Sequence, residues 1–151
     1  MPRVASELTA HLGYWLRYVS NHVSHAFARK LEKRDVTVAE WAVLRELYGA
    51  GPVTPSKLAS KLGLTRGAIS KLADRLIAKS LMVRRASLAD ARAQTLTLTP
   101  QGRLIVPVLA ALADQNDAEF FAHLSAAERA EMERILRNIV ARRGLRVAPI
   151  S

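Results

Sequence analysis

The sequence contains no cysteine, which excludes disulfide bonds, zinc–thiolate sites and redox sensing by thiols. It also has few acidic residues, with 13 Asp and Glu against 23 Lys and Arg, and aromatic residues make up only 5% of the chain. No apolar run is long enough to span a bilayer, and residues 1–8 lack the apolar core of a signal peptide. We therefore expect a cytoplasmic protein without a membrane partner.

Half of the 151 residues are apolar and 24% are charged, a balance that is typical of globular proteins. This apolar content is too high for a disordered chain. A chain of this length suits one domain, so we expect a single domain over residues 1–151.

The excess of basic residues is concentrated in residues 52–99. This segment has nine basic residues and two acidic ones, so it carries +7 of the formal net charge of +10. Clustered cations favour a polyanion as partner, because each phosphate that Lys or Arg neutralises releases a condensed counterion. A solvated basic face would have the same composition, so the positions of the charges must distinguish the two. The basic residues are Lys57, Lys61, Arg66, Lys71, Arg75, Lys79, Arg84, Arg85 and Arg92.

Helical periodicity marks long segments on both sides of this basic region. Apolar residues recur every three or four positions over residues 8–31, 99–123 and 125–144. Capping boxes at residues 37–40 and 125–128 predict the starts of two helices. Such amphipathic helices must bury their apolar faces against something.

Residues 54–79 have the spacing of a helix-turn-helix. Thr54 and Pro55 open a short helix that ends at Gly63, and Thr65 caps the next helix. Gly63 supplies the positive φ that a tight turn between the two helices needs. A plain helical hairpin is the alternative, but the basic excess on the same segment favours a DNA-binding motif.

Two short strands follow this pair of helices, at residues 81–85 and 94–98. A polar turn near residues 89–92 joins them. The sequence therefore predicts a hairpin directly after the second helix.

The second helix of the pair should present a polar face to DNA. We expect base-edge contacts from Arg66, Ser70 and Lys71, because recognition helices touch bases from their first turns. Gly67 has no side chain and would allow close approach. Thr65 at the helix N-terminus can orient free backbone N–H groups toward a phosphate. The cations expected to contact the DNA backbone without reading its sequence are Lys57 and Arg75.

The most specific pattern in the chain lies at residues 90–102. Asp90-Ala91-Arg92 is followed by Leu96-Thr97-Leu98-Thr99-Pro100-Gln101-Gly102, and these segments resemble the wing and the following helix start of the MarR (multiple antibiotic resistance regulator) family. The resemblance extends over residues 8–140. It implies that Asp90 and Arg92 shape the wing tip, with the arginine in or near the minor groove, where a narrow groove has an enhanced negative potential.

Two positions depart from the family pattern. Many members have a second arginine where Ala91 stands, which weakens the expected wing contact. Ser80 occupies a position usually held by glycine after the recognition helix, so the end of that helix is not defined by the sequence.

The resemblance implies a mainly α fold with a small β component (α+β). Its parts are a winged helix-turn-helix lobe at residues 52–99 and dimerisation helices at residues 6–33 and 100–143. It further implies a sequence-specific transcriptional regulator that acts as a homodimeric repressor and needs no cofactor. Such a repressor binds a palindromic, inverted-repeat operator in double-stranded DNA and is released by a small-molecule effector.

An architectural DNA-binding protein without sequence preference is the alternative. An enzyme is not expected, because we find no Gly-rich phosphate loop, nucleophile–base arrangement or recognisable carboxylate pair.

The first helix carries a second stripe beside its apolar face. Its members follow one another at steps of three or four residues: His11, Tyr14, Tyr18, His22, His25 and Arg29. The stripe either packs against a partner subunit or binds a small aromatic effector, as family members do near the junction of the dimerisation helices and the DNA-binding lobe. The candidate effector residues are Tyr14, Trp15, Tyr18 and His22. A metal site would need ligands beyond the histidines that the sequence does not identify, so none is predicted.

Overall fold

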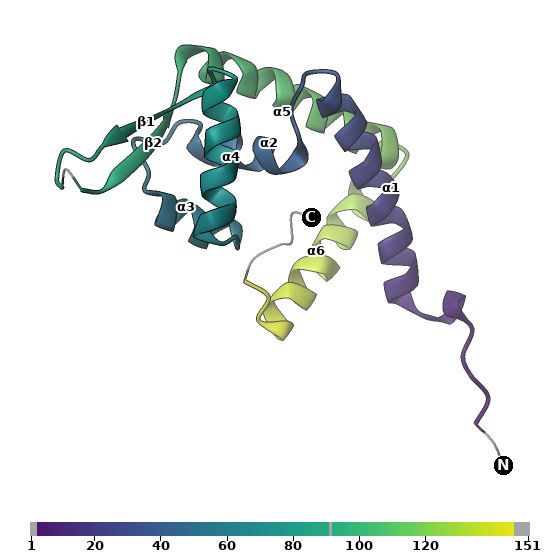
Figure 1. Cartoon of the computed structure of the whole chain (residues 1–151). Coiled ribbons are helices and arrows are strands. Elements are labelled where there is room, and N and C mark those ends of the chain that lie inside the picture. The colour runs from purple at the N-terminus through teal and green to yellow at the C-terminus, as the bar shows by residue number, and fades with distance from the viewer. Residues whose placement is uncertain (1–2, 91, 147–151) are drawn as a thin grey trace.

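The computed structural model describes residues 3–90 and 92–146 (Figure 1). A short 3-10 turn, η1 (Leu8–Ala10), precedes α1 (Leu12–Glu32) and α2 (Val38–Leu47). Next come α3 (Pro55–Leu62), α4 (Arg66–Ala78) and the strands β1 (Met82–Ala86) and β2 (Gln94–Leu98). The helices α5 (Pro100–Phe121) and α6 (Ala126–Arg143) complete the order, which confirms the predicted mainly α fold with a winged helix-turn-helix.

Five helices begin where the sequence predicts, because a Ser or Thr side chain caps each of them. In every case its hydroxyl oxygen accepts the backbone N–H three residues further on, at distances of 3.0–3.2 Å. The capping boxes at residues 37–40 and 125–128 are both complete. Gly63 ends α3 with a φ of 66°, the left-handed conformation predicted for the turn. The capping residues are Thr37, Thr54, Thr65, Thr99 and Ser125.

The core lies where α2, α3 and α4 meet the hairpin and the first half of α5. Its fully buried side chains include Leu44, Leu58, Leu76, Leu96 and Leu109, one from each of these elements. The helix-turn-helix and the hairpin therefore share one hydrophobic core.

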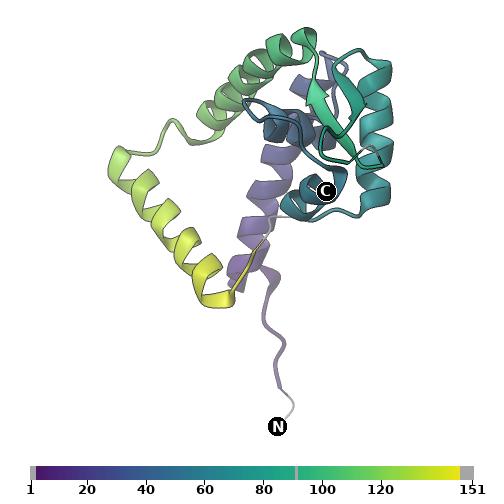
Figure 2. The same ribbon diagram turned by 90° about the vertical axis from the view of Figure 1, so that its left-hand side faces the viewer.

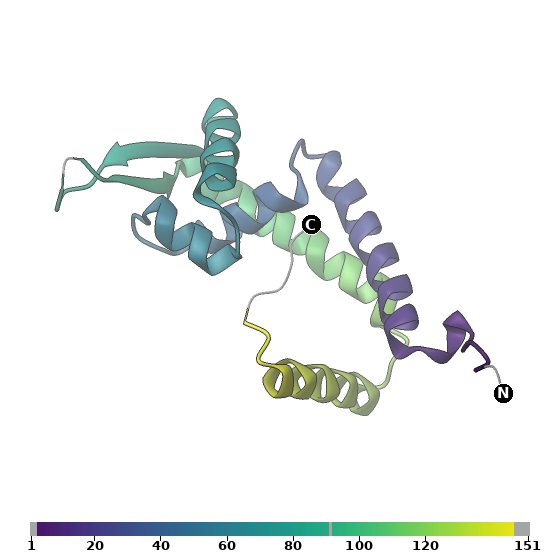
Figure 3. The same ribbon diagram turned by 60° about the horizontal axis from the view of Figure 1, so that its bottom comes forward.

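The two strands are antiparallel and pair from Met82 with Leu98 to Ala86 with Gln94. Val53, just before α3, forms a bridge with Leu96 and so ties the helix-turn-helix to the sheet. The hairpin projects from the lobe on the side away from α1 (Figure 3).

The N-terminal helix differs from the continuous helix predicted over residues 8–31. His11 is extended, with φ −100° and ψ 128°, and separates η1 from α1. The carbonyl of Thr9 accepts the indole N–H of Trp15 at 3.0 Å, and no side chain caps the start of α1. A side-chain donor has thus taken a carbonyl that a continuous helix would pair within its own backbone.

The helices α1 and α5 lie side by side and are joined by a polar network. The side-chain amide of Asn116, which is buried, donates to the carbonyl of Val23 at 3.1 Å. Lys30 donates to Asn116 and to Glu119, at 2.9 and 2.7 Å. The helix α6 folds back from the end of α5 (Figure 2), and none of its residues, all of which the structure describes, is buried.

Candidate nucleic-acid interface

The helix α4 presents a polar face to solvent because four of its apolar residues turn inward. Ile69, Leu72, Ala73 and Leu76 are buried. The predicted reading residues lie on the outer surface: Arg66, Gly67, Ser70 and Lys71 are exposed. A methyl group added at Gly67 would meet only the Thr65 hydroxyl, at 3.9 Å, so this part of the helix surface is open.

Three of the remaining predicted DNA contacts come from two further elements and are also exposed. Lys57 lies on α3, while Asp90 and Arg92 lie in the turn of the hairpin. Asp90 shapes this turn, since its carboxylate accepts the backbone N–H of Arg92 at 3.0 Å and its carbonyl accepts that of Ala93 at 3.0 Å. Ala91, at which the family pattern is broken, lies outside the described residues.

A groove of about 550 Å³ runs between the first half of α4 and the hairpin. Arg66, Gly67 and Ser70 line it from α4, and Gln94 lines it from β2. An ion pair spans the groove. The guanidinium of Arg84 on β1 donates to Asp74 on α4 at 3.0 Å.

Four of the nine basic residues in the lobe form ion pairs with acids. Lys61 pairs with Glu46, Arg84 pairs with Asp74, and both Arg75 and Lys79 face Glu40. Lys57, Arg66, Lys71, Arg85 and Arg92 have no ion pair with any residue in 3–90 or 92–146. The unpaired cations are therefore shared among α3, the first turns of α4 and the hairpin.

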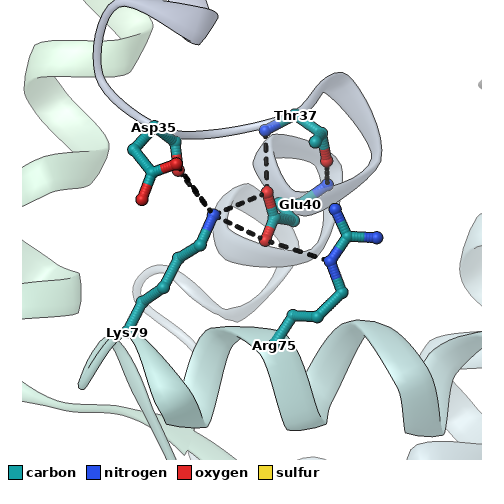
Figure 4. Close-up of polar contacts among 5 residues, drawn as sticks. All are labelled: Asp35, Thr37, Glu40, Arg75 and Lys79. Carbon is teal, nitrogen blue, oxygen red and sulfur yellow. Dashed lines mark hydrogen bonds and ion pairs between the residues drawn. The ribbon is translucent and has the colours of Figure 1, made fainter.

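A buried carboxylate holds the second half of α4, and the sequence pattern did not reveal this role (Figure 4). Glu40 on α2 is fully buried, and its Oε1 accepts the N–H of Thr37 at 2.8 Å and the ammonium of Lys79 at 3.1 Å. Its Oε2 accepts no hydrogen bond from a described residue and lies 3.1 Å from Lys79 Nζ and 3.8 Å from Arg75 Nε. Lys79 also donates to the carbonyl of Asp35, so it joins the α1–α2 loop to the end of α4.

The charge on Glu40 is stabilised despite its burial. Burial disfavours the ionised form, but the Thr37 N–H and the Lys79 ammonium outweigh it and hold the pKa of Glu40 below its ordinary value. Capping-box spacing identified Glu40 as the partner of Thr37. Its cations lie far along the chain, where no local pattern could point to them.

The end of α4 is fastened to the start of α5 through residues 80–81 and 99–102. Ser80 has a φ of 63°, which resolves the helix end that the sequence left undefined. The hydroxyl of Thr99 donates to the carbonyl of Ser80 at 2.7 Å, and its N–H donates to that of Leu81 at 3.1 Å. A methyl group at Gly102 would overlap the Leu81 carbonyl oxygen, so only glycine allows this close approach.

The candidate effector residues form an aromatic row along α1. The rings of Tyr18 and His22 stack with centroids 5.2 Å apart, and Tyr14 packs edge-on against Trp15 at 5.2 Å. Tyr14 is half-buried, and the other three are exposed. In the part of the chain that the structure describes, no group of three or more His, Asp or Glu residues could hold a metal ion.

Apolar side chains also remain exposed on both flanking elements. Leu12 is 82% exposed and Leu16 51%, and α6 exposes Met132, Ile135 and Ile139 at 44–45%. An apolar groove of about 530 Å³ lies between α5 and α6, with Phe121 and Leu136 among the residues that line it.

Among the described residues, no helix is both long enough and apolar enough to cross a membrane.

Comparison with known proteins places these features in a family context. The family model described as the MarR family matches residues 34–93. An uncharacterised HTH-type transcriptional regulator from Bacillus cereus is 34% identical over 93 residues, which cover 58% of this chain and 59% of that protein. The chain thus spans about three fifths of the length of this curated relative.

Two solved structures match over a larger share of the chain. A mutant MarR from Escherichia coli, solved in complex with operator DNA, matches with a TM-score of 0.76 and 27% identity, over 85% of this chain and 93% of that one. CouR from Rhodococcus jostii, solved with p-coumaroyl-CoA bound, matches with a TM-score of 0.75 and 25% identity, over 89% and 95% of the two chains.

Proposed function

We propose that this chain, which is similar to the MarR family of transcriptional regulators, binds a specific operator in double-stranded DNA as a homodimeric repressor. The observation that carries the proposal is the set of unpaired cations on α3, α4 and the hairpin. Arg66 and Lys71 stand on the outer face of α4, and Arg92 stands at the hairpin turn. These positions suit a helix in the major groove and a wing at the neighbouring minor groove.

The flanking helices support the dimer. The apolar side chains of α1 and α6 remain exposed in the part of the chain that the structure describes, and a second copy would bury them. Two copies related by a two-fold axis would present two α4 helices. Such a dimer requires an inverted-repeat operator with half-sites about one DNA turn apart.

A small aromatic effector would release the operator. The row of Tyr14, Trp15, Tyr18 and His22 offers stacking surfaces on α1, a helix that packs against α5. The p-coumaroyl-CoA bound to CouR supports an aromatic ligand class. Release requires only that the effector bind the DNA-free conformation more tightly than the DNA-bound one.

The test is a titration of duplex DNA from the promoter of the protein's own gene, at two salt concentrations, with and without aromatic acids. Arg66→Ala should lower affinity and relax preference at one base position, whereas Lys57→Ala should weaken all sequences about equally. Equal binding of promoter and shuffled duplexes by the wild-type protein would instead identify an architectural DNA-binding protein. Unchanged affinity and preference in Arg66→Ala would refute the proposed docking of α4.

A further inference from the structure

An acidic side chain stands on the face of α4 that is proposed to meet DNA. Asp74 lies one turn after Ser70 on the helix, and its side chain is 64% exposed. Phosphates would be repelled by a carboxylate in this position. The other acid of the lobe, Asp90, accepts the Arg92 N–H and so shapes the hairpin turn. Asp74 has no comparable role in a local turn.

The carboxylate of Asp74 holds a cation that would otherwise be available to DNA. The terminal amino group of Arg84 donates to it at 3.0 Å, and the Arg84 side chain is 29% exposed. Both residues line the groove between α4 and the hairpin, together with Arg66 and Ser70. Arg84 therefore lies among the proposed DNA contacts, but its charge is already paired.

The pair also connects two elements that would enter different grooves. Asp74 belongs to α4 and Arg84 to β1, the first strand of the wing. Exposed ion pairs contribute little to folding stability, so stability alone gives a weak reason to keep an acid at this position. A role in choosing between DNA sequences gives a stronger one.

We propose that Asp74 is a specificity-determining residue. This proposal rests on the proposed function of the protein as a sequence-specific DNA-binding regulator. By holding Arg84, it withholds one cation from sequence-independent contact with phosphates. It also fixes the wing relative to α4, in the arrangement that the operator requires. Binding to unrelated DNA is weakened by both the carboxylate charge and the loss of a free cation, while operator binding retains the benefit of the fixed wing.

The experiment measures affinity for two duplexes of equal length at several salt concentrations. One is a duplex selected from a random pool by the wild-type protein, and the other is its shuffled sequence. Asp74→Asn should bind the shuffled duplex about 3- to 10-fold more tightly, with a salt dependence steeper by about 0.9 for one added phosphate contact. Affinity for the selected duplex should rise less, so the ratio of the affinity for the selected duplex to that for the shuffled duplex should fall. Asp74→Glu, which can restore the pair, should retain the wild-type ratio.

Two further variants separate this role from a general effect of charge. Asp114→Asn changes the net charge equally at an exposed position on α5, outside the lobe. It should leave the ratio unchanged. In an Arg84→Gln background, Asp74→Asn should give a smaller gain in affinity for the shuffled duplex than it gives in the wild-type background, because only the carboxylate charge is removed and no cation remains to be released.

The outcomes distinguish this inference from the proposed function. A wild-type protein that does not prefer the selected duplex contradicts sequence-specific binding. A wild-type protein that does prefer it, with Asp74→Asn weakening the shuffled duplex or matching Asp114→Asn, overturns the role of Asp74 alone. The role of Asp74 is also overturned if Asp74→Asn gives the same gain in affinity for the shuffled duplex in the Arg84→Gln background as in the wild-type background.

Discussion

Ser80 has a backbone φ of 63°, in the region where a side chain is unfavourable and glycine is not. Its N–H donates to the carbonyl of Ile77 at 2.9 Å, and the N–H of Leu81 donates to that of Leu76 at 3.0 Å, so the left-handed residue closes the end of α4. We predict that Ser80→Gly raises the free energy of unfolding by about 0.5–1 kcal/mol. Chemical denaturation at a fixed protein concentration measures the change.

Ser60 provides the matched control for this substitution. It is exposed on the third helix, where glycine is unfavourable. Ser60→Gly should therefore lower the free energy of unfolding by about 0.5 kcal/mol. A loss of stability in both variants would contradict the account of Ser80.

Arg75 illustrates what could be predicted at the residue scale. The sequence predicted it as an outward-facing cation on α4, and its side chain is exposed. Its Nε is 3.8 Å from the buried Glu40, a partner on another helix that periodicity cannot identify. The face that a side chain occupies follows from local spacing, whereas its ion-pair partners follow from how the helices cross. Contact between Arg75 and DNA stays a prediction.

At the scale of the elements, α4 is held to α2 by the contacts of Arg75 and Lys79 with the buried carboxylate of Glu40. The pKa of Glu40 is lowered on folding because the Thr37 N–H and Lys79 outweigh the effect of burial. Its contribution to stability is therefore present above the ordinary carboxyl pKa and is lost as the pH falls through the lower pKa of the folded state. We predict that the wild-type protein loses stability steeply over this acidic range.

Glu40→Gln tests this dependence, because glutamine keeps the shape of the side chain and removes its charge. It should lower the free energy of unfolding by about 1–3 kcal/mol at neutral pH. It should also flatten the loss of stability toward acidic pH. Urea unfolding of both proteins between neutral and acidic pH makes the comparison, and equal slopes in the two proteins would contradict the predicted role.

The starts of α2 to α6 were predictable from the sequence, because each depends on a hydroxyl and an N–H three residues apart. The break at His11 was not, since it accompanies a side-chain hydrogen bond from Trp15 to Thr9. The hairpin was predictable from two short strand-like segments and the polar turn between them, but the ion pair of Asp74 and Arg84 across the groove was not. Such pairs depend on the tertiary placement of the wing against α4.

At the scale of the whole molecule, α6 offers the clearest test of the proposed dimer. Leu136 lines the apolar groove between α5 and α6 and is 40% exposed. Leu136→Glu would place a charge in the proposed interface. We predict that it raises the dimer dissociation constant at least about tenfold, which corresponds to roughly 1.4 kcal/mol. Sedimentation equilibrium measures this constant directly.

Asn138 supplies a control on the polar side of the same helix. Its side chain accepts a hydrogen bond from Arg142 at 3.0 Å and lies off the apolar stripe. Asn138→Glu introduces the same charge and should leave the dissociation constant nearly unchanged. Equal dissociation in the two variants would show that charge on α6, rather than its apolar face, controls association.

The fastening of α4 to α5 has a mechanical consequence. Thr99 caps α5 and at the same time binds the carbonyls of Ser80 and Leu81, while Gly102 leaves no space for slippage between them. We therefore expect the adjoining ends of α4 and α5 to move together. We expect a rotation of α5 at its far end, where α1 packs, to be passed on to α4. In the proposed dimer, α5 would then affect both the spacing and the orientation of the two α4 helices.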